Sequence, residues 1–284
     1  MIKVEKLAVT SRSFSNHSVL RRELESHFGQ VTFNDTGKVL AHDELVPFLR
    51  GHSHAIVGLE SVGERLLSEL PELKVVSKYG VGLDMIDLDA LEKRGVLLGW
   101  TGGVNRRSVA ELALTLALSL VRGIPGSQRN LNGGVWKPAP GRQLTGKTVG
   151  ILGCGHIGKD LVGLLAPFQC EVLACDLKSY SDFYAEHRVT ATSLPELLKR
   201  CDLVSIHVPL NDSTRGLLGP RELDLMKPGA FIVNTARGGI VDEGALKQRL
   251  QSGHLGGAAF DVFATEPSDD RELLEHPRFL CTPH

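Results

Sequence analysis

The stretch TVGILGCGHIG, residues 148–158, decides the fold of this chain. Residues 148–152 form a short apolar run typical of a buried strand, and three glycines in the spacing G-x-G-x-x-G follow it directly. Gly153 permits a tight turn, Gly155 lets a phosphate group approach the backbone, and Gly158 lets a helix pack against the strand. Strand, glycine loop and helix in this order are typical of a dinucleotide site.

The residues around the glycines extend this interpretation. A helix that begins near His156 and Ile157 would direct unpaired N–H groups and a positive dipole towards the phosphates, while His156 itself is expected to face solvent. Asp176 ends the next apolar run, 18 residues past Gly158, where a carboxylate would hydrogen-bond the adenosine ribose. Because a carboxylate repels a 2'-phosphate, we expect NAD. Lys178 keeps NADP as an alternative, and a turn that binds no phosphate is the other.

Strand and helix signals alternate along the whole chain. In the first part, strands are expected at 6–10, 55–59, 73–77 and 96–99, with helices at 18–28, 63–70 and 87–94. In the second part, strands are expected at 149–152, 171–175, 203–206, 231–234 and 257–260, with helices at 157–165, 194–199 and 243–251. Short apolar strands that alternate with helices predict parallel, doubly wound sheets. We therefore expect an α/β protein with two domains, residues 1–101 and 102–284.

The connection between the two parts has its own pattern. Ser108, with Glu111 three residues later, predicts a capping box at the start of an apolar, buried helix. Residues 123–141 look like a long loop that contains Trp136, Pro138 and Pro140. Connections of this length inside a compact chain are usually functional or belong to an interface.

Composition excludes several classes of protein. The 284 residues are 42% hydrophobic and carry a formal net charge of -1, which favours neither nucleic acid nor an anionic membrane surface as a partner. Charges among the first six residues argue against a secretory signal, and the apolar run 112–121 is too short to span a bilayer. No C-x-x-C pair or other metal-ligand spacing is present, so no metal site is expected, and the scattered cysteines indicate reduced thiols in the cytoplasm: Cys154, Cys170, Cys175, Cys201 and Cys281.

Charged residues follow the later strands at the points where those strands end. Arg237 comes after the strand 231–234, and Asp261 and Glu266 come after the strand 257–260. His284 stands at the end of the sequence. Because parallel strands present their carboxyl ends at one edge, these side chains would converge on one crevice. Singly, Arg237 could be a surface charge, Glu266 a turn residue and His284 an ordered loop histidine.

With these residues in view, the sequence resembles the D-isomer-specific 2-hydroxyacid dehydrogenases, over nearly its whole length. The motifs that carry the resemblance are YGVGLDMID (79–87), NRRSVAELAL (105–114), GKTVGILGCGHIG (146–158), HVPLNDSTRGLL (207–218), MKPGAFIVNTARGGIVDEGAL (226–246), GGAAFDVFATEP (256–267) and TPH (282–284). The resemblance implies a flavodoxin-like substrate domain, an NAD-binding Rossmann domain and a homodimer. It implies NAD-dependent interconversion of a D-2-hydroxy acid and its 2-keto acid.

The resemblance also implies roles for matching residues. Arg237 would bind the substrate carboxylate and polarise its carbonyl, and His284 would be the general acid–base, oriented and tuned by Glu266. Asp261 would contact the nicotinamide carboxamide, and further cofactor contacts would come from His207, Val208, Pro209, Thr214, Thr235 and Ala236. The substrate carboxylate would rest on a loop formed by Lys78, Tyr79, Gly80, Val81 and Gly82.

The sequence departs from this family in two places. Family members continue past the histidine through a helix that returns to the first domain, so we expect residues 1–101 to be completed by a helix absent from this sequence. Glu60 stands where phosphoglycerate dehydrogenases tend to have an arginine near the substrate phosphate, so D-3-phosphoglycerate is one candidate substrate that Glu60 would disfavour if it faced the site. The alternative function is that of the C-terminal-binding corepressors, which share these motifs but act as dinucleotide-sensing interaction proteins.

Overall fold

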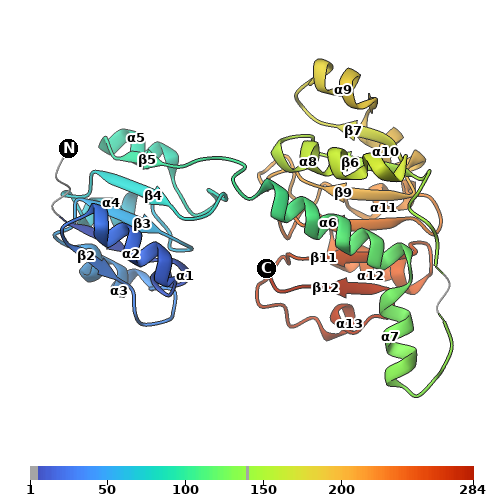
Figure 1. The fold of residues 1–284 in the computed structure, drawn as a ribbon, viewed down its shortest axis with the longest axis horizontal. Coiled ribbons are helices and arrows are strands. Elements are labelled where there is room, and N and C mark those ends of the chain that lie inside the picture. The colour runs from blue at the N-terminus through green and yellow to red at the C-terminus, as the bar shows by residue number, and fades with distance from the viewer. Residues whose placement is uncertain (1–5, 139–140) are drawn as a thin grey trace. The chain divides into compact units, whose positions relative to one another are not determined.

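The computed structural model describes residues 6–138 and 141–284 (Figure 1). The chain divides into two compact units, Met1–Asn105 (unit 1) and Arg106–His284 (unit 2). The start of the chain at residues 1–5, where we looked for a secretory signal, and Pro140 of the connecting arm lie outside the described residues. The sequence placed the boundary between the domains near residue 101, and the two units meet at residues 105 and 106.

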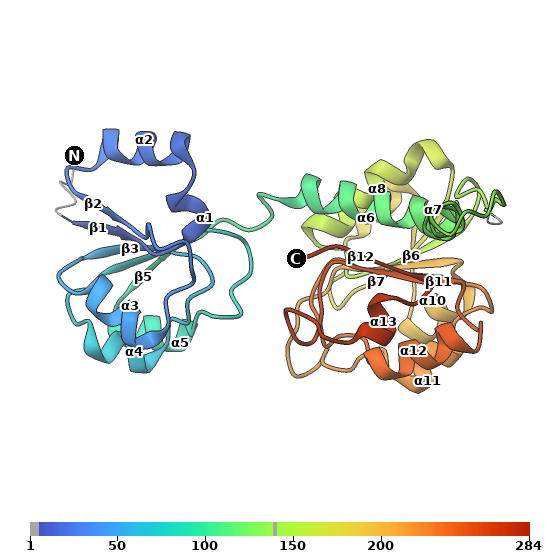
Figure 2. The same ribbon diagram turned by 90° about the horizontal axis from the view of Figure 1, so that it is seen from below.

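Unit 1 is built around a five-stranded parallel sheet with the strand order β2-β1-β3-β4-β5. This is the flavodoxin-like order, as the fold prediction required. The strands are β1 (Leu7–Val9), β2 (Val31–Phe33), β3 (His54–Val57), β4 (Val75–Lys78) and β5 (Leu97–Gly99). The helices are α1 (Arg12–Ser15), α2 (Ser18–His27), α3 (His42–Leu49), α4 (Glu64–Glu69) and α5 (Leu88–Arg94). Figure 2 shows α2 on one face of the sheet and α3, α4 and α5 on the other.

The main core of unit 1 lies between the sheet and helices α3, α4 and α5. Val57 and Val76 point from the strands into this layer, and Leu45 and Leu66 meet them from the helices. Residues along a strand alternate between faces, so the same strands direct His54 and Val75 to the other side of the sheet, where both are only half-buried.

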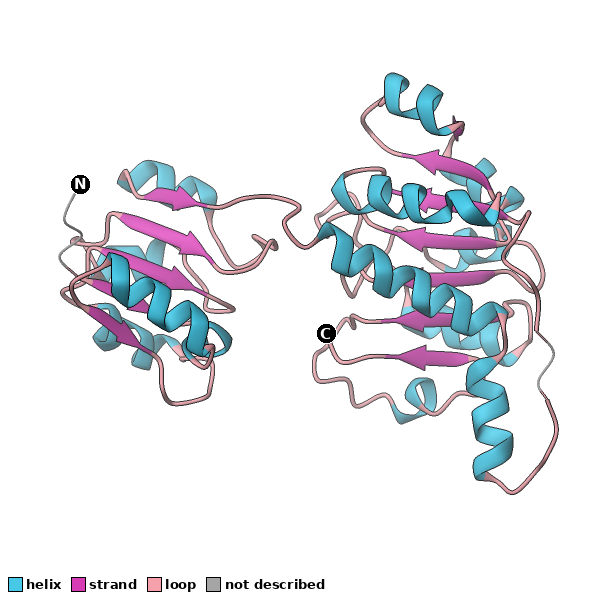
Figure 3. Cartoon of the chain, in the orientation of Figure 1, coloured by secondary structure: helices cyan, strands magenta, loops and turns pink. Residues whose placement is uncertain are grey.

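Unit 2 is built around a seven-stranded parallel sheet with the order β12-β11-β10-β9-β6-β7-β8 (Figure 3). Counted from the first strand of the unit, this is the Rossmann order 3-2-1-4-5-6 with one further strand, and its order reverses between β6 and β9. The strands are β6 (Thr148–Leu152), β7 (Glu171–Cys175), β8 (Val189–Ala191), β9 (Leu203–Ile206), β10 (Phe231–Asn234), β11 (Gly257–Phe260) and β12 (Phe279–Cys281).

Helices cover both faces of this sheet. They are α6 (Arg106–Val121), α7 (Ile124–Asn132), α8 (His156–Leu165), α9 (Ser181–His187), α10 (Leu194–Arg200), α11 (Pro220–Leu225), α12 (Glu243–Gln251) and α13 (Arg271–Leu274), with a 3-10 turn η1 (Ala166–Phe168). In Figure 2, α6 and α8 lie on one face, and α10, α11 and α12 lie on the other. Each layer has its own buried cluster, the first around Leu116 and Leu161 and the second around Leu197 and Leu246.

Two expectations about the connecting region are wrong. Helix α6 begins at Arg106, so Ser108 lies in its first turn and is not its N-cap; the two arginines before Ser108 are good helix formers. The stretch 123–141 is not all loop, because α7 occupies Ile124–Asn132. Pro125 lies in the first turn of α7, where a missing N–H costs no hydrogen bond. No side chain of α7 is buried, and its sequence IPGSQRNLN contains proline, glycine and asparagine, which are weak helix formers.

No single helix among the described residues is long and apolar enough to cross a membrane. Helices α6 and α7 meet the length and composition test only as a pair, and they are bent by 62°. Ala110, Leu116 and Leu120 of α6 are buried in the core of unit 2.

We predict opposite effects on stability for alanine at two glycines of unit 2. A Cβ at Gly150 in β6 would lie 2.6 Å from Leu197 Cδ2 and 2.8 Å from Cys201 Sγ, so Gly150→Ala should destabilise unit 2 by about 1–3 kcal/mol. A Cβ at Gly163 in α8 would meet nothing within 4 Å, so Gly163→Ala should stabilise it by about 0.5–1 kcal/mol. Urea unfolding followed by circular dichroism measures both, and the same sign for both variants would contradict the packing described here.

Candidate active site

The carboxyl edge of the unit 2 sheet places the expected cofactor residues in one row. The hydrogen-bonding pattern of the strands continues one residue past their ends: Gly153 N donates to Cys175 O (2.9 Å), His207 N to Leu152 O (2.7 Å), Asp261 N to Asn234 O (3.0 Å) and Thr282 N to Phe260 O (3.1 Å). The residues that follow the strands therefore stand side by side across the edge, in the order Asp176, Gly153, His207, Thr235, Asp261 and Thr282. This row crosses the point where the strand order reverses, which is where such sheets bind ligands.

The three positions of the loop differ in whether packing requires glycine. Gly153 has φ +94°, and a Cβ there would lie 2.8 Å from the carbonyl carbon of His207. A Cβ at Gly158 would overlap the carbonyl oxygen of Gly153. A Cβ at Gly155, the residue before α8, would meet nothing within 4 Å. Packing therefore requires Gly153 and Gly158, whereas Gly155 faces open space at the start of a ten-residue helix that begins with His156 and Ile157. This arrangement fits a phosphate group at Gly155.

Asp176 is fixed by backbone donors of the glycine loop and of its own turn. Its Oδ2 accepts from Cys154 N at 2.7 Å and its Oδ1 accepts from Lys178 N at 2.8 Å. Both oxygens are thereby held at the mouth of the glycine loop, where a ribose would lie next to the phosphates. Leu177 beside it is 99% exposed and offers an apolar surface at the same place.

Two polar atoms at the centre of the row are buried without a partner among the described residues. They are His207 Nδ1 and Thr235 Oγ1. His207 Nε2 lies 2.9 Å from the buried Ser205 Oγ, and burial lowers the pKa of His207 to about 4. The imidazole is therefore neutral near pH 7, which suits a hydrogen bond to a cofactor better than proton transfer. These two atoms fit the polar groups of a dinucleotide lying along the row.

The remaining cofactor residues lie in the loops that follow β9 and β10. Val208 packs on Gly153, since a Cβ at that glycine would lie 2.9 Å from Val208 Cγ1. Thr214 closes its loop by donating to Pro209 O at 2.6 Å. Ala236 N donates to the buried Asn234 Oδ1 at 3.0 Å.

Hydrogen bonds to residues of its own strand end fix the backbone at Arg237. Asn234 Nδ2 donates to the Arg237 carbonyl at 2.9 Å, and Arg237 Nη1 donates to Ala236 O at 2.7 Å. The next residue, Gly238, is pressed against another loop, because a Cβ there would overlap the carbonyl carbon of Phe263. The loop that carries Arg237 and the loop that carries Glu266 are therefore in backbone contact.

Glu266 and His284 form the expected pair. His284 Nδ1 lies 2.9 Å from Glu266 Oε2, and Glu266 Oε1 accepts from Phe263 N at 2.9 Å. Both side chains are partly exposed, at 48% for His284 and 38% for Glu266. With Nδ1 directed at the carboxylate, Nε2 is the ring nitrogen that can exchange a proton with a bound molecule. Asp261 is held at its Oδ1 by the hydroxyl of Thr282 at 2.6 Å.

The expected substrate loop belongs to unit 1 and is firmly braced there. Lys78 Nζ donates to the carbonyls of Gly58 and Tyr79, and Trp100 Nε1 donates to Val81 O at 3.1 Å. Gly80 has φ +115°, in the region that favours glycine. Among the described residues, the N–H groups of Val81 and Gly82 donate to no backbone carbonyl, which suits an anion-binding turn.

Glu60 does not stand out into solvent. It is 2% exposed, and its Oε2 accepts from Thr10 Oγ1 at 2.7 Å and from Gly58 N at 2.8 Å. The carboxylate thus joins the carboxyl ends of β1 and β3 inside unit 1. From the sequence, Glu60 was considered as an acidic group near the substrate. Its hydrogen bonds to Thr10 and Gly58 are visible only in the structure.

Sequence reasoning missed three supporting residues, Ser205, Asn234 and Thr282. They hold His207, the Arg237 loop and Asp261 respectively. The available signal was a polar residue within or at the end of an otherwise apolar strand, as in LVSIH and FIVNT. Buried polar side chains need partners, so such residues are candidates for support of a site. No group of three or more His, Cys, Asp or Glu side chains is placed to hold a metal ion within residues 6–138 and 141–284.

Comparison with known proteins agrees with this arrangement. Residues 114–284 match the family model of the D-isomer specific 2-hydroxyacid dehydrogenase NAD binding domain. The chain belongs to the D-isomer specific 2-hydroxyacid dehydrogenase family. The D-3-phosphoglycerate dehydrogenase of Mycobacterium bovis is 41% identical over 226 residues, which are 79% of this chain and 43% of that protein. The chain thus spans about half the length of such relatives.

Solved structures of other proteins resemble this chain over nearly its whole length. D-lactate dehydrogenase from Aquifex aeolicus, complexed with NAD and lactic acid, aligns with a TM-score of 0.83 and 28% identity over 99% of this chain and 88% of that one. D-mandelate dehydrogenase from Rhodotorula graminis aligns with a TM-score of 0.86 and 26% identity over 100% of this chain and 88% of that one. Unit 2 is accordingly an NAD-binding domain, and the expectation of NAD is confirmed.

Alanine at Gly155 and at Gly158 should separate cofactor binding from folding. Gly155→Ala should leave the stability of the cofactor-free protein within about 0.5 kcal/mol of the wild type and weaken NADH binding roughly 10- to 100-fold, because the methyl group would occupy the space of a phosphate. Gly158→Ala should lower both the stability and the affinity for NADH, because a Cβ at that position would force α8 away from the loop. Fluorescence titration with NADH and urea unfolding measure the two effects. Unchanged NADH affinity in Gly155→Ala would rule out a phosphate at that glycine.

Proposed function

We propose that this protein interconverts a D-2-hydroxy acid and its 2-keto acid with NAD. The observation that carries the proposal is the His284–Glu266 pair, which lies on the same unit as Arg237 and the dinucleotide loop. The carboxylate holds one ring nitrogen, so the imidazole has a defined tautomer and an outward-facing Nε2. The names of the relatives support the same reaction class.

Each residue of the site would have a separate role in the reaction. When bound, NADH supplies a hydride to C2 of the keto acid, and NAD accepts it in the reverse direction. His284 donates the proton to the keto oxygen in reduction and removes it from the hydroxyl in oxidation, so each turnover transfers one hydride and one proton. Glu266 orients the His284 ring through its Nδ1, and Arg237 binds the carboxylate and polarises the carbonyl through its guanidinium. Asp261, held by Thr282, would bind the nicotinamide carboxamide.

The substrate would be a small 2-hydroxy or 2-keto acid. Its carboxylate would be held by the N–H groups of Val81 and Gly82 in the loop 78–82 of unit 1. The relatives named above act on phosphoglycerate, lactate and mandelate by name, so the family leaves the rest of the substrate open. Because Glu60 is turned inwards to Thr10 and Gly58, it does not offer its charge to a substrate on the surface of unit 1.

We propose further that two copies associate through the arm that begins with α7. Helix α7 buries no side chain, and it and the residues after it expose a run of apolar side chains: Ile124, Leu131, Val135 and Trp136. Trp136 is 91% exposed, which is unusual for the largest apolar side chain in a monomer.

The five cysteines are all free, which supports a reducing compartment such as the cytoplasm.

Replacement of His284 should abolish turnover but not cofactor binding. NADH oxidation is to be measured with glyoxylate, hydroxypyruvate, pyruvate, 2-ketoisocaproate and phosphohydroxypyruvate. With the best of these acids, His284→Ala should lose about 100- to 10,000-fold in kcat/KM. The control His187→Ala, at the end of α9, should retain wild-type rates. Equal rates for His284→Ala and the wild type would overturn the acid–base role. Tight NADH binding without turnover of any acid would favour the dinucleotide-sensing alternative.

Charges placed on the α7 arm should separate the two copies. The double variant Leu131→Glu, Trp136→Glu should have the mass of one 30.8 kDa chain in light scattering, and the wild type should have twice that mass. Leu177→Glu, at a leucine elsewhere on unit 2 that is 99% exposed, is the control and should remain a dimer. A monomeric wild type, or a dimer unaffected by the double variant, would contradict this interface.

A further inference from the structure

The segment Val262–Pro267 carries Glu266 and is anchored in the core only at its start, where Val262 is buried and the Phe263 ring packs against Phe279. It leaves the end of β11 and leads to α13, and residues 264–267 are exposed. Glu266 bonds to Phe263 N of the same segment, so this bond fixes the shape of the segment and not its position in the protein. The exposed residues 264–267 need a further contact to hold the carboxylate within reach of His284.

The contact that does so comes from Glu243, the first residue of α12. Glu243 Oε1 accepts a hydrogen bond from Ala264 N at 2.7 Å, two residues before Glu266. Glu243 is half-buried, and burial is the main cause of its raised pKa, with the negative charges of Asp270 and Asp242 adding to it. A carboxyl group in such surroundings is unfavourable for stability, so a structural or functional gain is expected from the bond that it makes.

Glu243 belongs to a stripe on one face of α12. Lys247 and Gln251 follow it at intervals of four residues, which places all three side chains on the same side of the helix. Lys247 Nζ lies 2.8 Å from Asp270 Oδ2 and 3.2 Å from Glu272 Oε2, and Gln251 Nε2 donates to Glu272 Oε1 at 2.6 Å. The stripe therefore holds the chain at Ala264 and again at 270–272, on both sides of Glu266.

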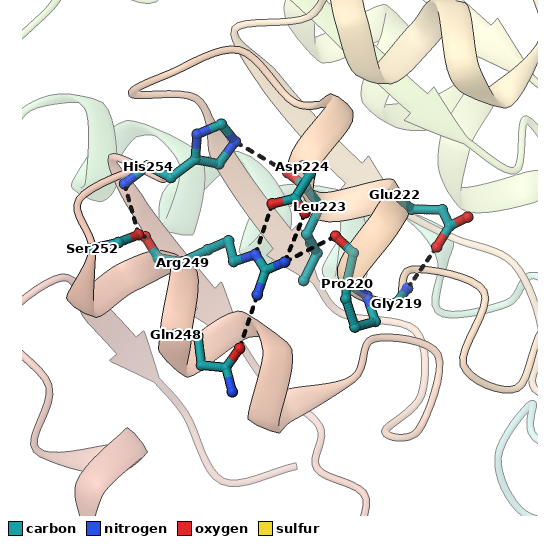
Figure 4. Close-up of polar contacts among 9 residues, drawn as sticks. All are labelled: Gly219, Pro220, Glu222, Leu223, Asp224, Gln248, Arg249, Ser252 and His254. Atoms are coloured by element: carbon teal, nitrogen blue, oxygen red, sulfur yellow. Dashed lines mark hydrogen bonds and ion pairs between the residues drawn. The ribbon is translucent and has the colours of Figure 1, made fainter.

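Helix α12 is a rigid support for this stripe. Its Leu246 and Leu250 are fully buried in the unit 2 core. Figure 4 shows Arg249 reaching from α12 to Asp224 of α11, with Nε to Oδ1 at 2.9 Å and Nη2 to Oδ2 at 2.8 Å, and also to Pro220 O at 3.2 Å. A paired guanidinium–carboxylate contact fixes orientation as well as distance. The position of Glu243 is thus set by the core and by α11.

Gly238 makes a second close contact with this segment. Its backbone approaches Phe263 so closely that a Cβ would overlap the Phe263 carbonyl carbon. Phe263 and Ala264 are therefore in contact both with the Arg237 loop and with Glu243.

We propose that Glu243 is a positioning residue for the acid–base pair: by accepting from Ala264 N–H, it holds the segment so that Glu266 meets His284 Nδ1. Glu243 contacts neither Glu266 nor His284 and takes no part in proton transfer. The catalytic meaning of this role rests on the proposed function. Misplacement of a catalytic group by about 1 Å can cost on the order of 100-fold in rate.

The first test measures the position of the Glu266 segment and the tautomer of His284, and it does not depend on enzyme turnover. Three variants of the full chain are compared with the wild type: Glu243→Ala, which removes the acceptor; Glu243→Gln, which keeps an acceptor oxygen; and Glu275→Ala, an exposed carboxylate on the neighbouring helix end, as the matched control. Nitrogen-15 spectra of the histidine rings, assigned with His284→Ala, report the tautomer of His284. Hydrogen exchange with mass spectrometry reports the protection of residues 261–267.

The expected result is specific to the bond. In the wild type, Glu243→Gln and Glu275→Ala, His284 should hold its neutral-form proton on Nδ1. In Glu243→Ala, both tautomers should appear and residues 261–267 should exchange at least about tenfold faster. Urea unfolding identifies a variant that fails to fold, and in that case Glu243→Gln against Glu243→Asp, whose shorter side chain cannot reach Ala264, decides the question. An unchanged tautomer and unchanged exchange in the variant that lacks the bond would overturn the proposal.

The second test reads the consequence for the reaction. Glu243→Ala should lower kcat about 10- to 100-fold with NADH affinity within twofold of the wild type, and Glu243→Gln should restore most of the loss. Normal kcat alongside a loosened segment would overturn the positioning role. If the wild type turns over no 2-keto acid but Glu243→Ala still shows the tautomer change, the result counts against the proposed reaction and leaves the Glu243 geometry standing.

Discussion

The parallel pairing of the seven strands in unit 2 is the constraint on which the rest of the site depends. Parallel strands in register end at one edge, so residues as distant in sequence as Asp176 and Thr282 stand in the same row. Gly153 and Gly158 make this edge usable, because only glycine allows β6, its loop and α8 to approach so closely. A sheet with mixed directions would scatter the same side chains over two edges.

A second theme is the way in which carboxylates are held. Asp176, Glu243, Glu266 and the buried Glu60 each accept a hydrogen bond from a loop N–H. Loop N–H groups lack the partners that helices and sheets provide, so a carboxylate satisfies the donor while the donor fixes the carboxylate.

The family's NAD-binding domain lies in unit 2, and the loop proposed to hold the substrate carboxylate belongs to unit 1. Unit 2 contains the family's NAD-binding domain and the groups suited to hydride and proton transfer. Unit 1 supplies the loop 78–82 and a different set of side chains. Relatives that are named for phosphoglycerate, lactate and mandelate share this architecture, which is expected if the reacting part of the molecule is common and the remainder varies.

The sequence by itself determined the features that depend on neighbouring residues. The glycine spacing, Asp176 after the second strand, and the Asp87 and Gly95 ends of α5 could all be read locally, because turns and caps are set by a few adjacent residues. Helices α1, α3, α7, α9, α11 and α13 and strands β2, β8 and β12 were not predicted. These three strands bury at most one residue each and α7 buries none, so the core leaves little pattern in their sequences. Only the tertiary structure decided that Glu60 turns inwards and that Glu243 supports the Glu266 segment. Those contacts join residues up to 50 positions apart, and no local pattern records which distant N–H or hydroxyl a carboxylate will meet.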